Sequence, residues 1–289
     1  MTHVPLYALS ESELRDHCKR SIEALEYWLR RLVDQQLTAA YGPRYLDAER
    51  PSGDRMIAAD ISRRLNARAT DRLRFPRTID AAFLDDLILI ICNPELYNLH
   101  FRTSLQDAYP NEGFARTQLS RLVRPRNSLS HANPISVHDA HRVLCYCQDA
   151  IEALKAHYRR EGLQQQFNVP SVVRVMDSLG HVAHLASDRM HPAMLDYSTE
   201  PTAQLRCGDT LSIEVTVDPS FDVEKYDIRW SIANVGGETQ FGPKFTLLMT
   251  ERYVSTRFCA VCFVVSREAW HKLGTYDDQV DVAYRVLPP

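Results

Sequence analysis

The stretch PRNSLSHANPISVHDAHR, residues 125–142, decides how the first half of the chain is interpreted. Asn127 and His131 are four residues apart, so a helix would place both side chains on one face, which the long side chain of Arg126 could also reach. Pro125 suits the first turn of a helix, where its missing N–H would be unpaired in any case. We therefore expect the hexapeptide from Arg126 to His131 to open a long helix.

Arg126, Asn127 and His131 supply a permanent cation, an amide and an imidazole that titrates near neutral pH. Such a set suits the handling of a phosphodiester. The alternative from composition alone is an Arg on a solvated face, a capping Asn and a histidine whose hydrogen bonds are satisfied. Neighbouring sequence has to separate the two interpretations.

Helical patterns fill the chain on both sides of this stretch. Ser10-Glu-Ser-Glu13 is a capping-box start, and apolar residues then recur at helical spacing until Gly42. Further helices are expected over residues 54–70, from Thr78 onward, over 111–123 and over 125–160. Sequential helices of this kind predict an antiparallel bundle over residues 1–162.

Beyond Gly162 the texture changes, and residues 163–205 are expected to form a linker or irregular segment. Residues 206–289 show alternating apolar and polar positions with turns, one of them at Gly236-Gly237, as in an all-β sandwich. A strand tryptophan, Trp230, fits an immunoglobulin-like core. The expected strands cover residues 211–217, 226–232, 245–249, 258–265 and 280–286. The predicted fold class is therefore multidomain, α then β.

Two patterns carry a resemblance to a known family. Residues 131–142 read H-x-x-P-[IF]-S-x-x-[DE]-A-x-R, and residues 23–33 read E-x-L-E-x-W-L-R-x-L-V. On these residues, the chain from 10 to 160 resembles the HEPN superfamily, and within it the branch named after the Swt endonuclease. Members are four-helix bundles with an Arg-(polar)-x-x-x-His motif before the last long helix.

The resemblance implies metal-independent RNA cleavage, in which a ribose 2′-OH attacks the adjacent phosphate. His131 would be the general acid or base, Arg126 would hold the phosphate, and Asn127 would orient the phosphate or the imidazole. Ser128 and Ser130 could add hydrogen bonds, although local capping is the alternative for both. HEPN enzymes pair two motifs across a dimer, so a homodimer through the bundle is expected.

Other polar residues of the first half are candidates for supporting roles. The family sometimes uses an acidic residue from an earlier helix, and Asp85 or Asp86 is best placed here, with a solvated helix edge as the alternative. Arg116, Arg121 and Arg124 precede the motif and are candidate RNA contacts, because Arg binds phosphate through two parallel hydrogen bonds. A solvated helix face is again the alternative.

Composition bounds the remaining possibilities. The 289 residues carry a net charge of −3, so no global attraction to nucleic acid is predicted. No apolar run could span a bilayer and no export signal precedes Ser10, so we expect a cytoplasmic protein without membrane contact. Seven cysteines, an odd count without a pairing ladder, predict reduced thiols, and we expect neither a metal nor a cofactor.

The expected function is an endoribonuclease acting on RNA, with tRNA among the candidate substrates, as a toxin or effector in prokaryotic antiviral defence. The β domain would bind a protein partner, activator or substrate. Two other hypotheses stay open: a non-catalytic HEPN scaffold that dimerises and recruits proteins, and nucleotide binding or transfer without RNA cleavage.

Overall fold

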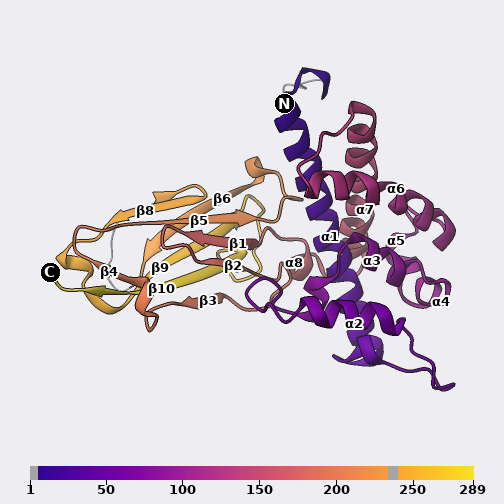
Figure 1. The fold of residues 1–289 in the computed structure, drawn as a ribbon, viewed down its shortest axis with the longest axis horizontal. Helices are drawn as coiled ribbons and strands as arrows, with labels where there is room; N and C mark the ends of the chain where they lie inside the picture. Colours follow the sequence, from indigo (N-terminus) through magenta and orange to yellow (C-terminus); the bar gives the residue numbers. More distant parts are fainter. Residues whose placement is uncertain (1–5, 234–239) are drawn as a thin grey trace. The chain divides into compact units, whose positions relative to one another are not determined.

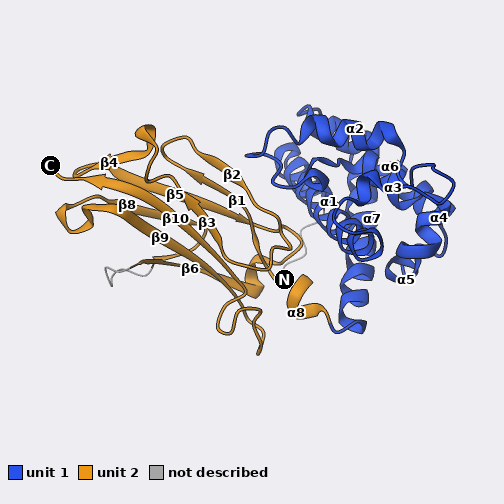
Figure 2. Ribbon diagram, turned by 90° about the horizontal axis from the view of Figure 1, so that it is seen from below, with its two compact units in different colours: residues 1–162 blue, residues 163–289 orange. Residues whose placement is uncertain are grey.

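The computed structural model describes residues 6–233 and 240–289, and the chain divides into two compact units, Met1–Gly162 and Leu163–Pro289 (Figure 2). The first unit is helical and the second is built from β-strands (Figure 1), which confirms the predicted order, α then β. None of the helices in the described ranges has the length and apolar character needed to cross a bilayer.

The first predicted helix is confirmed almost to the residue. Helix α1, Glu11–Tyr41, begins with a capping box in which Ser10 Oγ accepts from the Glu13 N–H (3.3 Å) and Glu13 Oε2 accepts from the Ser10 N–H (2.8 Å). It ends at Gly42, whose φ of 79° favours glycine. Local signals at both ends therefore fix this helix.

Four helices of the first unit pack around a shared core. Helix α1 contacts α3, α6 and α7, and α6 also contacts α3 and α7. Helices α1 and α7 lie side by side (Figure 1), with the rings of Trp28 and Tyr158 5.8 Å apart and both side chains fully buried. The α-helices of this unit are α1, α2 (Ala59–Arg68), α3 (Leu84–Ile91), α4 (Pro94–Leu96), α5 (Arg102–Leu105), α6 (Glu112–Ser130) and α7 (Val137–Arg160). The antiparallel arrangement expected for the bundle stays a prediction.

The region between α1 and α6 differs from the sequence expectation. The second helix is shorter than expected, and the third is a 3-10 turn, Thr78–Ala81, followed by α3. A helical segment that the apolar pattern did not predict runs from α4 through a π-helix, Tyr97–Phe101, into α5. Its start carries a recognisable signal, because Asn93 caps the helix and Pro94 occupies the first turn.

Burial of His157 on α7 predicts a loss of stability in acid. Burial lowers the pKa of His157, with Arg160 acting in the same direction and Glu161 and Asp107 opposing it. Burial also lowers the pKa of His100, whose ring lies 2.7 Å from the Tyr41 hydroxyl. Below the unfolded-state pKa of about 6.5, the unfolded chain binds protons that the folded chain does not. Stability should therefore fall as the pH drops from about 6.5 through the folded pKa values.

We expect His157→Gln to reduce this fall, as measured by urea unfolding of the wild type and the variant at several pH values between 7.5 and 5. His138→Gln, an exposed position on the same helix, is the matched control and should keep the wild-type pH dependence. Parallel stability curves for wild type and His157→Gln would contradict the expectation.

The second unit is a pair of sheets. One sheet has the antiparallel order β2-β1-β5-β8, and the other has the order β3-β10-β9-β6-β7. Strands β3 and β4 both pair with β10 in parallel. The strands are β1 (Val172–Asp177), β2 (Val182–His184), β3 (Ala193–Asp196), β4 (Gln204–Arg206), β5 (Thr210–Val217), β6 (Tyr226–Ile232), β7 (Gln240–Phe241), β8 (Lys244–Leu248), β9 (Ser255–Ser266) and β10 (Asp278–Leu287). The five predicted strands coincide with β5, β6, β8, β9 and β10.

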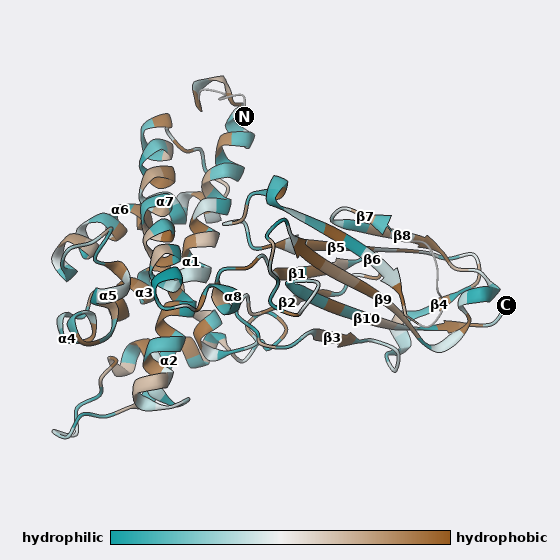
Figure 3. Cartoon of the chain, turned by 180° about the vertical axis from the view of Figure 1, so that it is seen from behind, coloured by the Kyte–Doolittle hydropathy of each residue, from teal (hydrophilic) through white to brown (hydrophobic). Residues whose placement is uncertain are grey.

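The two sheets share one buried core. Trp230 on β6 is fully buried, and its ring lies 5.3 Å from that of Phe245 on β8 in the opposite sheet. Strand β9 is largely hydrophobic along its length (Figure 3) and pairs with β6 and β10 on its two sides. A sandwich core is therefore present. The turn expected at Gly236-Gly237 lies outside the described residues.

Residues 163–205 are not a linker, because they contain the short helix α8 (Gln164–Phe167) and strands β1 to β3 and most of β4. Arg189 links this segment to the core: it donates to the Val172 carbonyl (2.7 Å) and to the carboxylate of Asp278 on β10. Asp278 also accepts from the Val172 N–H (2.7 Å). Short strands stabilised by a distant partner leave only a weak periodic signal in the sequence.

Candidate functional site

The hexapeptide 126–131 lies at the end of a helix and not at its start. Helix α6 runs from Glu112 through Pro125 to Ser130, and His131 is its C-terminal cap. The prediction of a helix beginning at Pro125 was wrong because the buried face of α6, with Leu119, Leu122 and Leu129, continues across the proline. Tertiary packing here outweighs the local preference of proline for a first turn.

A tight turn follows the hexapeptide. The Ala132 N–H donates to the Leu129 carbonyl (3.1 Å) and the Asn133 N–H donates to the Ser128 carbonyl (2.9 Å), the two bonds of a Schellman motif. Ala132 has φ 57°, and among the described residues no other non-glycine has a positive φ. Helix α7 then starts at its cap Ser136, whose Oγ accepts from the Asp139 N–H (3.0 Å).

We expect Ala132→Gly to raise the free energy of unfolding by about 1 kcal/mol, because glycine adopts this left-handed conformation without a Cβ clash. Urea unfolding measures the change. Ala39→Gly, an exposed substitution inside α1, should lower stability by about 0.5–1 kcal/mol and controls for the general effect of glycine. A decrease in both variants would show that the turn does not strain Ala132.

Asn127 and His131 line one open hollow of about 490 Å³ at the end of α6, as their four-residue spacing predicts. Both residues are exposed, and the backbone N–H of His131 caps the helix by donating to the Asn127 carbonyl (3.2 Å). Apart from Val123, the lining is polar: Ser120, Arg124, Asn127, Ser128, His131 and Asn133. The cation of this lining is Arg124, because Arg126 is not part of it.

Arg126 lies against the neighbouring helices. Its Nε is 3.4 Å from Glu26 Oε1 on α1, and its guanidinium carbon is 4.5 Å from the centre of the Phe83 ring. Its Nη1 donates to Asn127 Oδ1 (3.3 Å), so Arg126 touches the hollow through the side chain of Asn127. The motif is thus split between a residue packed on α1 and two residues on the open surface.

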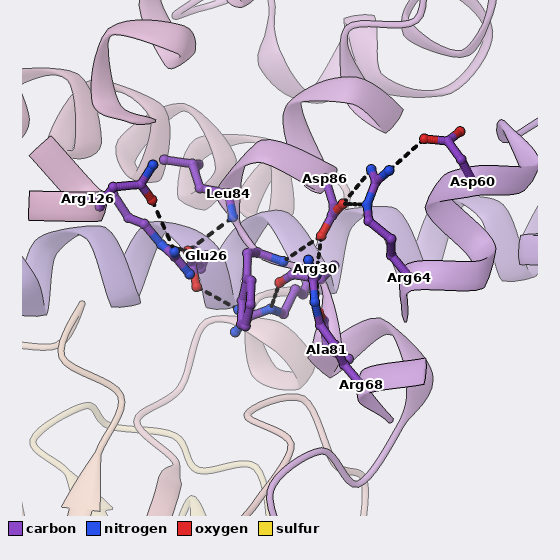
Figure 4. Close-up of polar contacts among 12 residues, drawn as sticks. Glu26, Arg30, Asp60, Arg64, Arg68, Ala81, Leu84, Asp86 and Arg126 are labelled. Carbon is purple, nitrogen blue, oxygen red and sulfur yellow. Dashed lines mark hydrogen bonds and ion pairs between the residues drawn. The ribbon is translucent and has the colours of Figure 1, made fainter. Parts of the chain in front are cut away.

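Glu26 is the centre of the contacts around Arg126 (Figure 4). Only 7% of this residue is exposed; its carboxylate accepts from Arg30 Nη2 (2.6 Å) and from the Leu84 N–H at the start of α3 (3.1 Å). Sequence reasoning gave Glu26 no role. The available signal was its position, because a carboxylate four residues after Ile22 interrupts the apolar stripe of α1.

The two candidate aspartates on α3 differ in environment. Asp86 is fully buried and accepts from Arg64 Nη2 (2.9 Å) and Arg68 Nη1 (2.5 Å), as Figure 4 shows. The alternative of a solvated helix edge is therefore wrong for Asp86, whose carboxylate forms ion pairs with both arginines, while Arg64 also pairs with Asp60. Asp85 is exposed in the first turn of the same helix.

The remaining candidates also divide. Arg116 Nη2 donates to the Cys92 carbonyl (2.5 Å) and Arg121 Nη1 donates to the Tyr146 hydroxyl (2.9 Å), so both have partners on neighbouring elements. Ser130 Oγ donates to the Arg126 carbonyl one turn earlier (2.9 Å), the local bond that was its alternative role. Ser128 lines the hollow. The structure therefore brings together Arg124, Asn127, Ser128 and His131.

No group of three or more histidine, cysteine or acidic side chains with metal-binding geometry occurs among the described residues. The cysteines there are free thiols, and burial raises the pKa of Cys18 and Cys92 to about 11. Cys262 on β9 is fully buried.

Comparison with known proteins adds no assignment: no model of a protein family matches the chain, and no curated protein is similar to it.

Proposed function

We propose that the helical unit is a metal-independent endoribonuclease of the HEPN type, and that the hollow at the end of α6 binds the scissile phosphate. The observation that carries the proposal is the convergence of Arg124, Asn127 and His131 on one open hollow, six of whose seven lining residues are polar or charged. A guanidinium and an amide are donors for phosphate oxygens, and an imidazole transfers protons near neutral pH.

The reaction would begin with loss of a proton from the ribose 2′-OH to a base as this oxygen attacks the adjacent phosphorus. The bond to the 5′-oxygen of the next nucleotide then breaks, and that oxygen receives a proton. The products are a 2′,3′-cyclic phosphate and a 5′-OH. His131 serves one of the two proton transfers, while Arg124 and the Asn127 amide stabilise the charge on the phosphorane.

A single imidazole serves only one of the two proton transfers at a time. A homodimer through the helical unit would bring a second copy of His131 to the substrate, in keeping with the resemblance to HEPN proteins. The sandwich, immunoglobulin-like in this proposal, would bind a partner or activator and would restrict a toxic nuclease to infected cells.

A scaffold without catalysis is the second candidate, and the contacts of Arg126 favour it. Its guanidinium packs on Phe83 and faces Glu26, as a residue does whose role is to join helices. In that case the motif would stabilise the bundle and a dimer, and the β unit would recruit another protein.

The test is incubation of purified protein with total RNA and with tRNA in EDTA, followed by end-group analysis and by sedimentation to determine the oligomeric state. The proposal expects products with a cyclic phosphate and a 5′-OH from a dimeric protein. A folded dimer that binds RNA but does not cleave it, with or without added divalent metal, would favour the scaffold.

A further inference from the structure

Three side chains form a polar network that runs from the buried interior of the helical unit to the hollow. Glu26 faces Arg126 Nε (3.4 Å), and Arg126 Nη1 donates to Asn127 Oδ1 (3.3 Å). Asn127 lines the hollow. The contact between Glu26 and Arg126 joins α1 to the end of α6, one hundred residues later in the sequence.

Glu26, the buried end of this polar network, is fixed in place. Glu26 is 7% exposed, and Arg30 Nη2 and the Leu84 N–H occupy its two oxygens at 2.6 Å and 3.1 Å. Arg30 is itself bound, since its Nε donates to the Ala82 carbonyl (2.8 Å). A carboxylate with partners on α1, at the start of α3 and on α6 has one position available to it.

The guanidinium of Arg126 packs with its face on the Phe83 ring, and its Nε faces Glu26. Its carbon is 4.5 Å from the centre of the Phe83 ring, and Arg68 is 4.3 Å from the same ring. Arg68 is fixed in turn by Asp86. Stacking on Phe83 and the contact with Glu26 together leave the Nη1 edge facing Asn127.

The hydrogen bond from Arg126 determines which way the Asn127 amide points. The oxygen Oδ1 accepts from Nη1, so the opposite end of the amide, the Nδ2 group with its two protons, is the end left for a ligand. A donor on the lining of the hollow, next to Arg124, matches an anion and not a cation.

We propose that Arg126 is a positioning residue, which together with Glu26 and Phe83 orients Asn127 as a hydrogen-bond donor to a phosphate group in the hollow, where Arg124 supplies the charge. The phosphate in this inference rests on the proposed function, but the orientation of Asn127 does not. The inference changes the role expected for Arg126, from direct contact with the phosphate to action through Asn127.

The first experiment requires no ligand: the side-chain amide resonances of Asn127 are recorded by ¹H–¹⁵N NMR in wild type and in Arg126→Met, Glu26→Gln and Phe83→Leu. All three variants should shift or broaden this amide pair, while Arg121→Met on the same helix should leave it unchanged. Phe83→Leu keeps every polar partner of Glu26, so the test survives if Glu26→Gln does not fold. An unchanged amide in folded Arg126→Met would overturn the inference.

The second experiment measures binding of a 2′-O-methyl RNA octamer, which cannot be cleaved, as a function of salt. Arg124→Met should reduce the slope of log K against log salt by about 0.7, the value for one lost phosphate contact on a single strand. Arg126→Met should weaken binding by about fivefold, as for one lost hydrogen bond, without changing the slope. A slope reduced equally in both variants would show that Arg126 contacts phosphate directly and would overturn the inference.

The two experiments separate the inference from the function on which it rests. If wild type does not bind the octamer, binding of RNA in the hollow is refuted and the amide spectra alone decide whether Arg126 orients Asn127. If wild type binds and the Asn127 amide resonances are unchanged in Arg126→Met, phosphate binding in the hollow is supported and the positioning role of Arg126 is refuted.

Discussion

Replacing His131 with alanine is expected to lower the rate of RNA cleavage by about 10²–10⁴-fold, the usual contribution of general acid or base catalysis. The fold should be unaffected, because the His131 side chain is exposed and the bonds that cap α6 come from its backbone N–H, which alanine retains. Single-turnover cleavage of a defined RNA in EDTA measures the effect without a contribution from product release.

Two further variants give this result its meaning. His131→Gln keeps a polar side chain of similar size but cannot transfer a proton in this pH range, so its rate should fall as far as that of His131→Ala. His138→Ala removes another exposed histidine, seven residues away and outside the lining of the hollow, and should cleave at the wild-type rate. Cleavage by His131→Gln within threefold of wild type would rule out proton transfer by this residue.

The spacing of Asn127 and His131 predicts their common face, although the hexapeptide lies at the other end of a helix from the one expected. Helical periodicity is the same in the first and the last turn, so the four-residue spacing gives the same face in either case. The spacing does not show whether the helix continues before or after the hexapeptide. This depends on whether Pro125 begins a helix or lies inside one. The packing of Leu122 and Leu129 on either side of the proline places it inside α6.

The environment of Arg126 could not be predicted from local sequence. Glu26 and Phe83 precede it by one hundred and by forty-three residues, and no periodic pattern reports contacts at such separations. The sandwich shows the same division: alternation finds the long strands β5, β6, β9 and β10, whereas β2 and β4, each of three residues, are too short to show a period. These two strands can be recognised only in the structure, from their pairing with the longer strands β1 and β10.

Asp86→Asn should lower the free energy of unfolding by about 3 kcal/mol, the lower end of the range for breaking a buried ion pair. The carboxylate is fully buried and forms ion pairs with Arg64 and Arg68, and Asp86 Oδ2 also accepts from the Phe83 N–H at the start of α3 (3.3 Å). An asparagine would keep the volume but remove the charge and turn an NH₂ group toward one guanidinium. The side chains of Arg64 and Arg68 are 39% and 27% exposed, so solvent would offset part of the loss.

Asp85→Asn is the matched control, since it makes the same chemical change at the adjacent, exposed position in the first turn of α3. It loses only a favourable interaction with the helix dipole, and stability should fall by about 0.5 kcal/mol. Urea unfolding of both variants gives the comparison. The difference bears on the site as well, because Arg68 shares the Phe83 ring with Arg126. If the two variants are equally stable, Asp86 does not fix Arg68, and the Phe83 ring is held by other contacts, such as that with the Phe75 ring (6.4 Å).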